Sequence, residues 1–157
     1  MSEFKRSVLS ESESQKVVDA LQRCLVDLID LSLLLKQAHW CVVGSQFRAV
    51  HLQLDEILND VRLGSDEIAE RISTLGLPPD GRSKTIAEKS TLPAMDLAFT
   101  SAGNTVSQVA DCLHQALRVL REGVNALGEL DPVSQDLLIG ITAGLEKHLW
   151  MVQSQEL

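Results

Sequence analysis

The stretch SQFRAVHLQLDEILNDVRLGSDEIAERISTLG, residues 45–76, has the pattern of one long amphipathic helix. Its apolar side chains recur at the spacing of an α-helix and gather on a single face. The residues of this face are Val50, Leu54, Ile57, Val61, Ile68, Ile72 and Leu75. Ser45 is suited to cap the start of the helix and Gly76 to end it. We therefore predict an unbroken helix with this face in the core.

Three further segments, residues 12–43, 100–128 and 131–155, have the same helical spacing. Ser12 or Ser14 would cap the first, and Asp131 with Pro132 would begin the last. Residues 77–93 are rich in Pro, Gly and Ser, so we expect a long connection there, followed by a short helix near Met95.

Four helices with one long crossover, between the second and the third, are typical of the ferritin-like class. We therefore predict an all-α, ferritin-like four-helix bundle. We expect residues 1–157 to form a single domain, in which residues 1–12 are a flexible N-terminal tail.

Composition and charge exclude several functions. The formal net charge is −8 and the pI about 4.9, so the surface repels nucleic-acid phosphates unless a local tail is basic. The three cysteines are odd in number and lack metal-site spacing, which favours reduced thiols and a cytoplasmic protein. The N-terminus does not have the pattern of a signal peptide, and we expect no membrane span.

The second helix also carries a polar stripe. His51 and Asp55 are four residues apart, and so are Asp66 and Glu70. All four side chains project within an arc of about 100°, away from the apolar face. The interval between His51 and Asp66 is about 22 Å along a helix, so one helix cannot bring them to one metal ion.

Two copies of the helix, crossing antiparallel about a two-fold axis, would bring these residues together. His51 would oppose Glu70, and Asp55 would oppose Asp66, because the residue numbers of each pair sum to 121. We expect the small residues Gly64 and Ser65 to let the two helices approach.

His39 ends the first predicted helix, across a short loop from the start of the second. It would add an imidazole to the same cluster. Two imidazoles with three carboxylates suit Fe²⁺, with Zn²⁺, Co²⁺ and Mn²⁺ as competitors. The alternative is that each pair is an ordinary solvated pair on a helix surface, and spacing alone leaves that alternative open.

The segments KQAHW, AVHLQLDE, SDEIAERISTLG and DLLIGITAGLEKHLW closely resemble the Dps family, the mini-ferritins known as DNA-binding proteins from starved cells. The resemblance covers roughly residues 15 to 155. It implies that His39, His51 and Asp55 of one subunit, with Asp66 and Glu70 of its two-fold mate, are the iron ligands and catalytic residues of a ferroxidase site.

The resemblance also implies a hollow dodecamer built from two-fold dimers. Family members oxidise Fe²⁺, preferably with hydrogen peroxide rather than dioxygen, and store the ferric mineral inside, which protects DNA from oxidative damage. Other ferritins use Glu-x-x-His pairs within one bundle, and this sequence contains none.

Two features depart from the family pattern. DNA-binding members carry lysine-rich tails, whereas this tail has only Lys5 and Arg6 among several glutamates. Some members line iron-entry pores with three acidic residues, and here Asp131 and Asp136 match two of them while Gly140 stands at the third. The alternative functions are a DNA-binding nucleoid shell with secondary metal binding, and a purely structural bundle.

Two tryptophans and two further histidines have possible roles. Trp40 and Trp150 are either packing residues or electron donors near the site. His114 and His148 have no acidic partner at ligand spacing, so we interpret both as structural.

Overall fold

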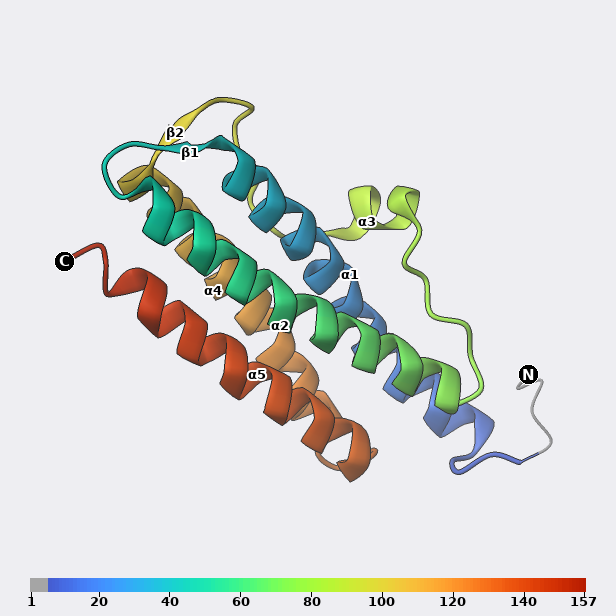
Figure 1. The fold of residues 1–157 in the computed structure, drawn as a ribbon. Coiled ribbons are helices and arrows are strands. Elements are labelled where there is room, and N and C mark those ends of the chain that lie inside the picture. Colours follow the sequence, from blue (N-terminus) through green and yellow to red (C-terminus); the bar gives the residue numbers. More distant parts are fainter. Residues whose placement is uncertain (1–5) are drawn as a thin grey trace.

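The computed structural model describes residues 6–157, so the predicted tail lies partly outside the described residues. The elements, in chain order, are α1 (Glu11–Cys41), β1 (Val42–Val43), α2 (Phe47–Thr74), α3 (Ser83–Lys89), β2 (Thr100–Ser101), α4 (Ala102–Leu127) and α5 (Pro132–Gln153). Four long helices form a bundle, and α3 lies within the crossover from α2 to α4 (Figure 1). The predicted all-α, ferritin-like bundle with one long crossover is confirmed.

The bundle is closed by contacts of α1 with α2 and α4, and of α5 with α4 and α2. At one end, β1 and β2 form a two-residue parallel ladder, which pairs Val42 with Thr100 and Val43 with Ser101. This ladder, which the sequence did not predict, ties the turn between α1 and α2 to the start of α4.

The predicted core face of α2 is confirmed, because all seven of its residues are buried. Gly64 is buried as well, and a Cβ there would lie 3.1 Å from the Ile141 side chain of α5. The expectation that Gly64 lets two copies of α2 approach is therefore wrong, since this glycine accommodates α5.

Helix α1 begins earlier than predicted. Ser10, rather than Ser12 or Ser14, is the N-cap, and it forms a capping box with Glu13. The Ser10 hydroxyl accepts from the Glu13 backbone N–H, and the Glu13 carboxylate accepts from the Ser10 backbone N–H. Glu13 stands three residues after Ser10, which is the spacing that this reciprocal cap requires.

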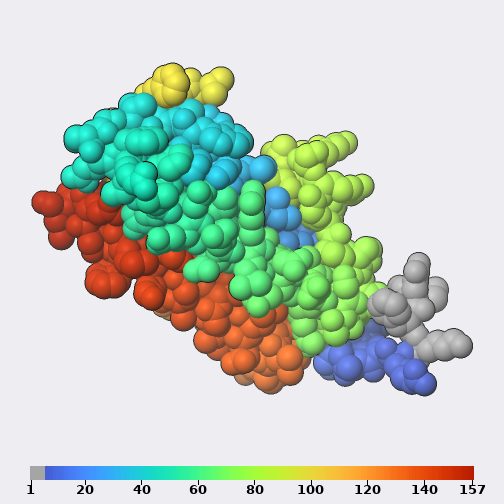
Figure 2. Space-filling view, in the orientation of Figure 1, coloured from blue at the N-terminus to red at the C-terminus, as the bar shows by residue number. Residues whose placement is uncertain are grey.

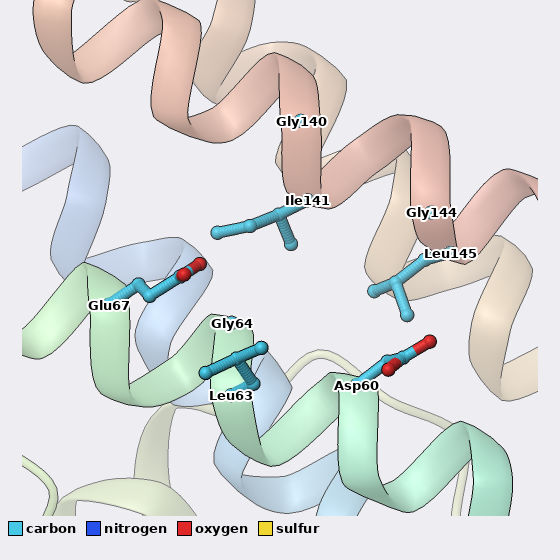
Figure 3. A pocket seen from close by; sticks show the side chains of 8 residues that line it. All are labelled: Asp60, Leu63, Gly64, Glu67, Gly140, Ile141, Gly144 and Leu145. Atoms are coloured by element: carbon cyan, nitrogen blue, oxygen red, sulfur yellow. The ribbon is translucent and has the colours of Figure 1, made fainter.

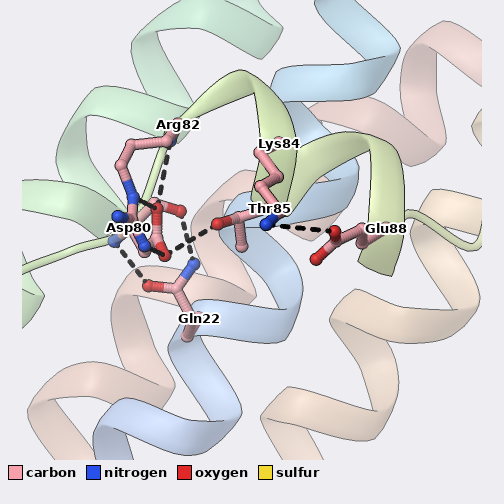
Figure 4. A network of polar contacts seen from close by, with 6 residues as sticks. All are labelled: Gln22, Asp80, Arg82, Lys84, Thr85 and Glu88. Atoms are coloured by element: carbon pink, nitrogen blue, oxygen red, sulfur yellow. Dashed lines mark hydrogen bonds and ion pairs between the residues drawn. The ribbon is translucent and has the colours of Figure 1, made fainter.

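The short helix of the crossover is α3, not a helix near Met95 as predicted. Gln22 of α1 pairs with the Asp80 peptide: Gln22 Nε2 donates to the Asp80 carbonyl and Gln22 Oε1 accepts from the Asp80 N–H, each at 2.8 Å. The Asp80 carboxylate in turn accepts from Arg82 and from Thr85 Oγ1 (Figure 4). Hydrogen bonds from Arg82 and Thr85 lower the pKa of Asp80.

Two aspartates of α1 hold the other end of α3. Asp27 accepts from the Thr91 backbone N–H at 2.9 Å and from its hydroxyl at 2.6 Å, and Asp30 accepts from the Ser90 hydroxyl. These bonds explain why an otherwise apolar stretch of α1 contains two acidic residues, one of which, Asp27, is fully buried.

Asp131 is the N-cap residue of α5 and Pro132 is its first residue, as predicted. The Asp131 carboxylate is buried and accepts from Arg71 at 2.7 Å and from the Ser134 hydroxyl. Burial acts to raise the pKa of Asp131, but the hydrogen bonds from Ser134 and Arg71 outweigh it and lower the pKa. Because Asp131 joins α2 to α5, it is not an open pore-lining ligand within this chain.

Candidate metal centre

Three of the five predicted ligands lie where α1 meets α2. His39 is in the last turn of α1, and His51 and Asp55 are in the first turns of α2. His39 is buried, whereas His51 and Asp55 are half-buried. The turn that reverses the chain between them contains Gly44, whose φ of 111° is a conformation that side-chain-bearing residues rarely adopt.

Each of the two histidine rings is hydrogen-bonded to the backbone of the other histidine. His39 Nδ1 lies 3.0 Å from the His51 carbonyl oxygen, and His51 Nδ1 lies 2.9 Å from the His39 carbonyl oxygen. Their rings stack with centroids 3.6 Å apart. A carbonyl oxygen can only accept, so both Nδ1 atoms carry the proton, which leaves a lone pair on each Nε2 when the ring is neutral.

Both Nε2 atoms are accessible. Within residues 6–157, His148 Nδ1 is the only buried side-chain nitrogen or oxygen that lacks a partner. Among these residues neither Nε2 has a hydrogen-bond partner, so both atoms retain some exposure to solvent. A carbonyl bond at Nδ1 with a free Nε2 is the usual arrangement of a metal-binding histidine, in which the carbonyl fixes the tautomer and ring orientation.

Asp55 forms an ion pair with Lys36. Lys36 Nζ donates to Asp55 Oδ1 at 2.7 Å, and the same oxygen lies 3.3 Å from His39 Nδ1. The hydrogen bond from Lys36 is the main cause that lowers the pKa of Asp55, and the two neighbouring histidines act in the same direction. The carboxylate is therefore held ionised, and a metal ion would have to replace Lys36 at this oxygen.

The structure does not bring Asp66 and Glu70 to this cluster. Both are exposed, farther along α2. Figures 1 and 2 show α2 along the front of the bundle, and no other described element covers its outward side. Within the described part of one chain, no three His, Cys, Asp or Glu side chains form a group that could hold a metal ion.

His148 has an acidic partner that sequence spacing did not reveal. Its Nε2 lies 2.6 Å from Asp60 Oδ2, so α5 contacts α2 here. Asp60 also lines a pocket of about 170 Å³ between α2 and α5, whose lining includes Gly64, Gly140 and Gly144 (Figure 3). This pocket is separate from the histidine cluster and shares no residue with it.

Comparison with known proteins identifies the family. A sequence model of the ferritin-like domain matches residues 18–155. The structure of Dps from Mycobacterium smegmatis superposes with a TM-score of 0.92 at 35% identity, covering 99% of this chain and 94% of that one. The chain belongs to the Dps family of ferritin-like proteins.

Other Dps proteins agree. The structure of Dps from Microbacterium arborescens in its high-iron form has a TM-score of 0.91 at 31% identity, over 96% of this chain and 98% of that one. A DNA protection during starvation protein of Deinococcus radiodurans is 33% identical over 93% of this chain and 71% of its own length.

A further relative is a pilus subunit by name. The fine tangled pili major subunit of Haemophilus ducreyi is 38% identical over 93% of this chain and 77% of its own length. In this Dps-family chain, no helix within residues 6–157 is long and apolar enough to cross a membrane.

Proposed function

We propose that this chain stores and detoxifies iron, oxidising Fe²⁺ at a site shared between two copies. One observation carries the proposal: His39 and His51 present free Nε2 atoms beside Asp55 at one end of an uncovered α2 face. The other end of that face carries exposed Asp66 and Glu70 at the matching spacing.

Each ligand has a role in this proposal. The imidazoles of His39 and His51 bind Fe²⁺, for which nitrogen ligands have good affinity. Asp55, with Asp66 and Glu70 of a second copy, supplies negative charge that compensates the added positive charge as iron passes from +2 to +3. Iron is the substrate, and the protein supplies ligands and geometry.

Hydrogen peroxide is the proposed oxidant, with dioxygen as the alternative. Two Fe²⁺ ions each give one electron to one peroxide molecule, which takes up two protons and leaves as two water molecules. Pairing the two electrons at one site avoids release of a hydroxyl radical. Fe³⁺ then hydrolyses, releases protons and is stored as mineral.

The assembly proposed is a homo-oligomer built from two-fold dimers, with twelve copies as in the resemblance drawn above. DNA is then protected from oxidative damage by removal of iron and peroxide. We do not favour the DNA-binding shell, because the net charge of −8 opposes binding to phosphates.

Complementation between two inactive variants tests the shared site. His51→Ala and Glu70→Ala should each abolish Fe²⁺ oxidation as homo-oligomers at limiting iron. When equal amounts are dissociated and reassembled together, about half of the dimers are mixed under random two-fold pairing. Each mixed dimer contains one doubly damaged site and one intact site, so about a quarter of all sites should regain activity.

His114→Ala is the matched control, because His114 is exposed and the variant should keep full activity as a homo-oligomer taken through the same dissociation and reassembly. A site built within one chain gives no recovery, since every subunit lacks a ligand. Absence of activity in mixtures that are verified by mass spectrometry would therefore refute the shared site.

A further inference from the structure

His51 is also in contact with the ring of Phe47. The Phe47 ring lies with its centroid 4.9 Å from that of His51, tilted by 38°. His39 stacks on the same imidazole at 3.6 Å. His51 is therefore in contact with two rings, one from α1 and one from the first residue of α2.

A ring held by one hydrogen bond can still move. The bond from His51 Nδ1 to the His39 carbonyl fixes the tautomer and one atom, but it allows the imidazole to pivot about that atom. Such a pivot moves Nε2, the metal-binding atom, most. Contacts from two neighbouring rings restrict the pivot. Without such contacts, a site whose ligands are all present can still bind metal weakly, because the ligands are poorly held.

Neither core packing nor helix capping explains the position of Phe47. Phe47 is 42% exposed, so it is not part of the buried core. The N-cap of α2 is Gln46, without a side-chain cap bond. Phe47 precedes His51 by one helical turn, so the two side chains are neighbours on the helix surface.

We infer that Phe47 is a positioning residue for the metal centre, which keeps His51 Nε2 aimed at the metal ion by packing its ring against the imidazole that His39 also contacts. The inference rests on the proposed function. It concerns how the ligand is held, and it does not require that iron be the metal bound.

Co²⁺ binding tests the inference without relying on iron oxidation. In Phe47→Leu, which keeps apolar volume but has no flat ring, Co²⁺ should bind about tenfold more weakly, the lower end of the loss seen when support of a metal ligand is removed. The visible Co²⁺ spectrum should also change, because it reports coordination geometry. Phe47→Tyr retains the ring and should restore both properties.

Phe99→Leu is the matched control, since Phe99 is 80% exposed and its substitution should leave Co²⁺ affinity and spectrum unchanged. In Fe²⁺ oxidation, Phe47→Leu should raise KM while kcat changes by less than about twofold, because weaker binding of the substrate ion is the expected defect. Sizing each variant separates this effect from a loss of assembly, and Phe47→Met repeats the test if the leucine variant dissociates.

Two results would overturn the inference: a wild-type Co²⁺ affinity and spectrum in Phe47→Leu, or an equal defect in Phe47→Tyr. Failure of the proposed function has a different signature. In that case wild-type protein fails to oxidise iron, whereas the Co²⁺ comparison between Phe47→Leu and Phe47→Tyr still decides the role of the ring.

Discussion

His39 and His51 each fix the other's ring through a backbone carbonyl, so a displacement at either residue reaches both proposed ligands. Asp55 differs from the two histidines, because its Oδ1 atom already accepts a hydrogen bond from Lys36. An ammonium group at this position neutralises the carboxylate while no metal ion is present. It also competes with any metal ion that binds this oxygen, and it repels the metal ion through its charge.

Lys36→Met should therefore tighten metal binding. A partly exposed ion pair contributes about 0.2–1 kcal/mol, so its removal should strengthen Co²⁺ or Fe²⁺ affinity by up to about fivefold. Isothermal titration of the assembled protein measures this change. Lys16→Met, on the exposed surface near the start of α1, should have no effect. Weaker binding in Lys36→Met would mean that Lys36 orients Asp55 rather than competing with the metal.

Residue pairs within one helix were predictable from the sequence, whereas pairs between helices were not. The four-residue spacing of His51 and Asp55 can be recognised in the sequence, because residues four apart are neighbours on the surface of a helix. His148 and Asp60 are 88 residues apart, and Arg71 and Asp131 are 60 apart. Their contacts depend on how helices pack, so local spacing contains no signal for them.

At the scale of elements, periodicity identified the long helices and failed in the crossover. Helix α2 extends over 28 residues, so its apolar positions repeat often enough to identify the helix from the sequence. Helix α3 has only seven residues, of which Thr85 and Ile86 are buried. Its position depends on Gln22, Asp27 and Asp30 of α1, which are tertiary partners and could not be recognised from the crossover itself.

The packing of α1, α4 and α5 has a sensitive point at Gly123. A Cβ there would lie 2.8 Å from Leu138 Cδ1 and 2.9 Å from Cys24 Sγ. Gly123→Ala should therefore lower the free energy of unfolding by about 1–3 kcal/mol, the usual cost of overpacking a core. Thermal unfolding followed by circular dichroism measures the loss.

Gly144→Ala is the matched control for this prediction. A Cβ at Gly144, in α5, would have nothing within 4 Å. Alanine favours a helix over glycine by up to about 1 kcal/mol, so this variant should be unchanged or more stable. Equal melting temperatures for the two variants would show that the contact at Gly123 relaxes without cost.

At the scale of the whole molecule, the outward face of α2 is the surface that the proposed two-fold partner would cover. It carries the exposed acids Asp66 and Glu70 together with exposed apolar side chains, Leu52 and Leu63. Leu63 is 58% exposed. Sequence reasoning identified the acids through their symmetric spacing. It did not identify Leu52 and Leu63 as exposed, because local periodicity does not encode which part of a helix surface the other helices leave uncovered.

Charge at this scale decides the expected behaviour toward DNA. Each chain has a net charge of −8, and every added copy in an oligomer adds the same charge, so the protein as a whole repels duplex DNA. We expect metal-free protein to leave duplex DNA unshifted in a gel at moderate salt.

The variant Ser2→Lys, Glu3→Lys, Ser7→Lys provides the comparison. Glu3→Lys adds two positive charges and each serine change adds one, so the charge rises from −8 to −4 and is concentrated beside Lys5 and Arg6. This variant should shift DNA, and the shift should weaken steeply as salt increases, because binding through phosphates releases counterions. Tight, salt-sensitive binding by the unmodified protein would contradict the prediction and would favour the DNA-binding shell over iron removal as the means of protecting DNA.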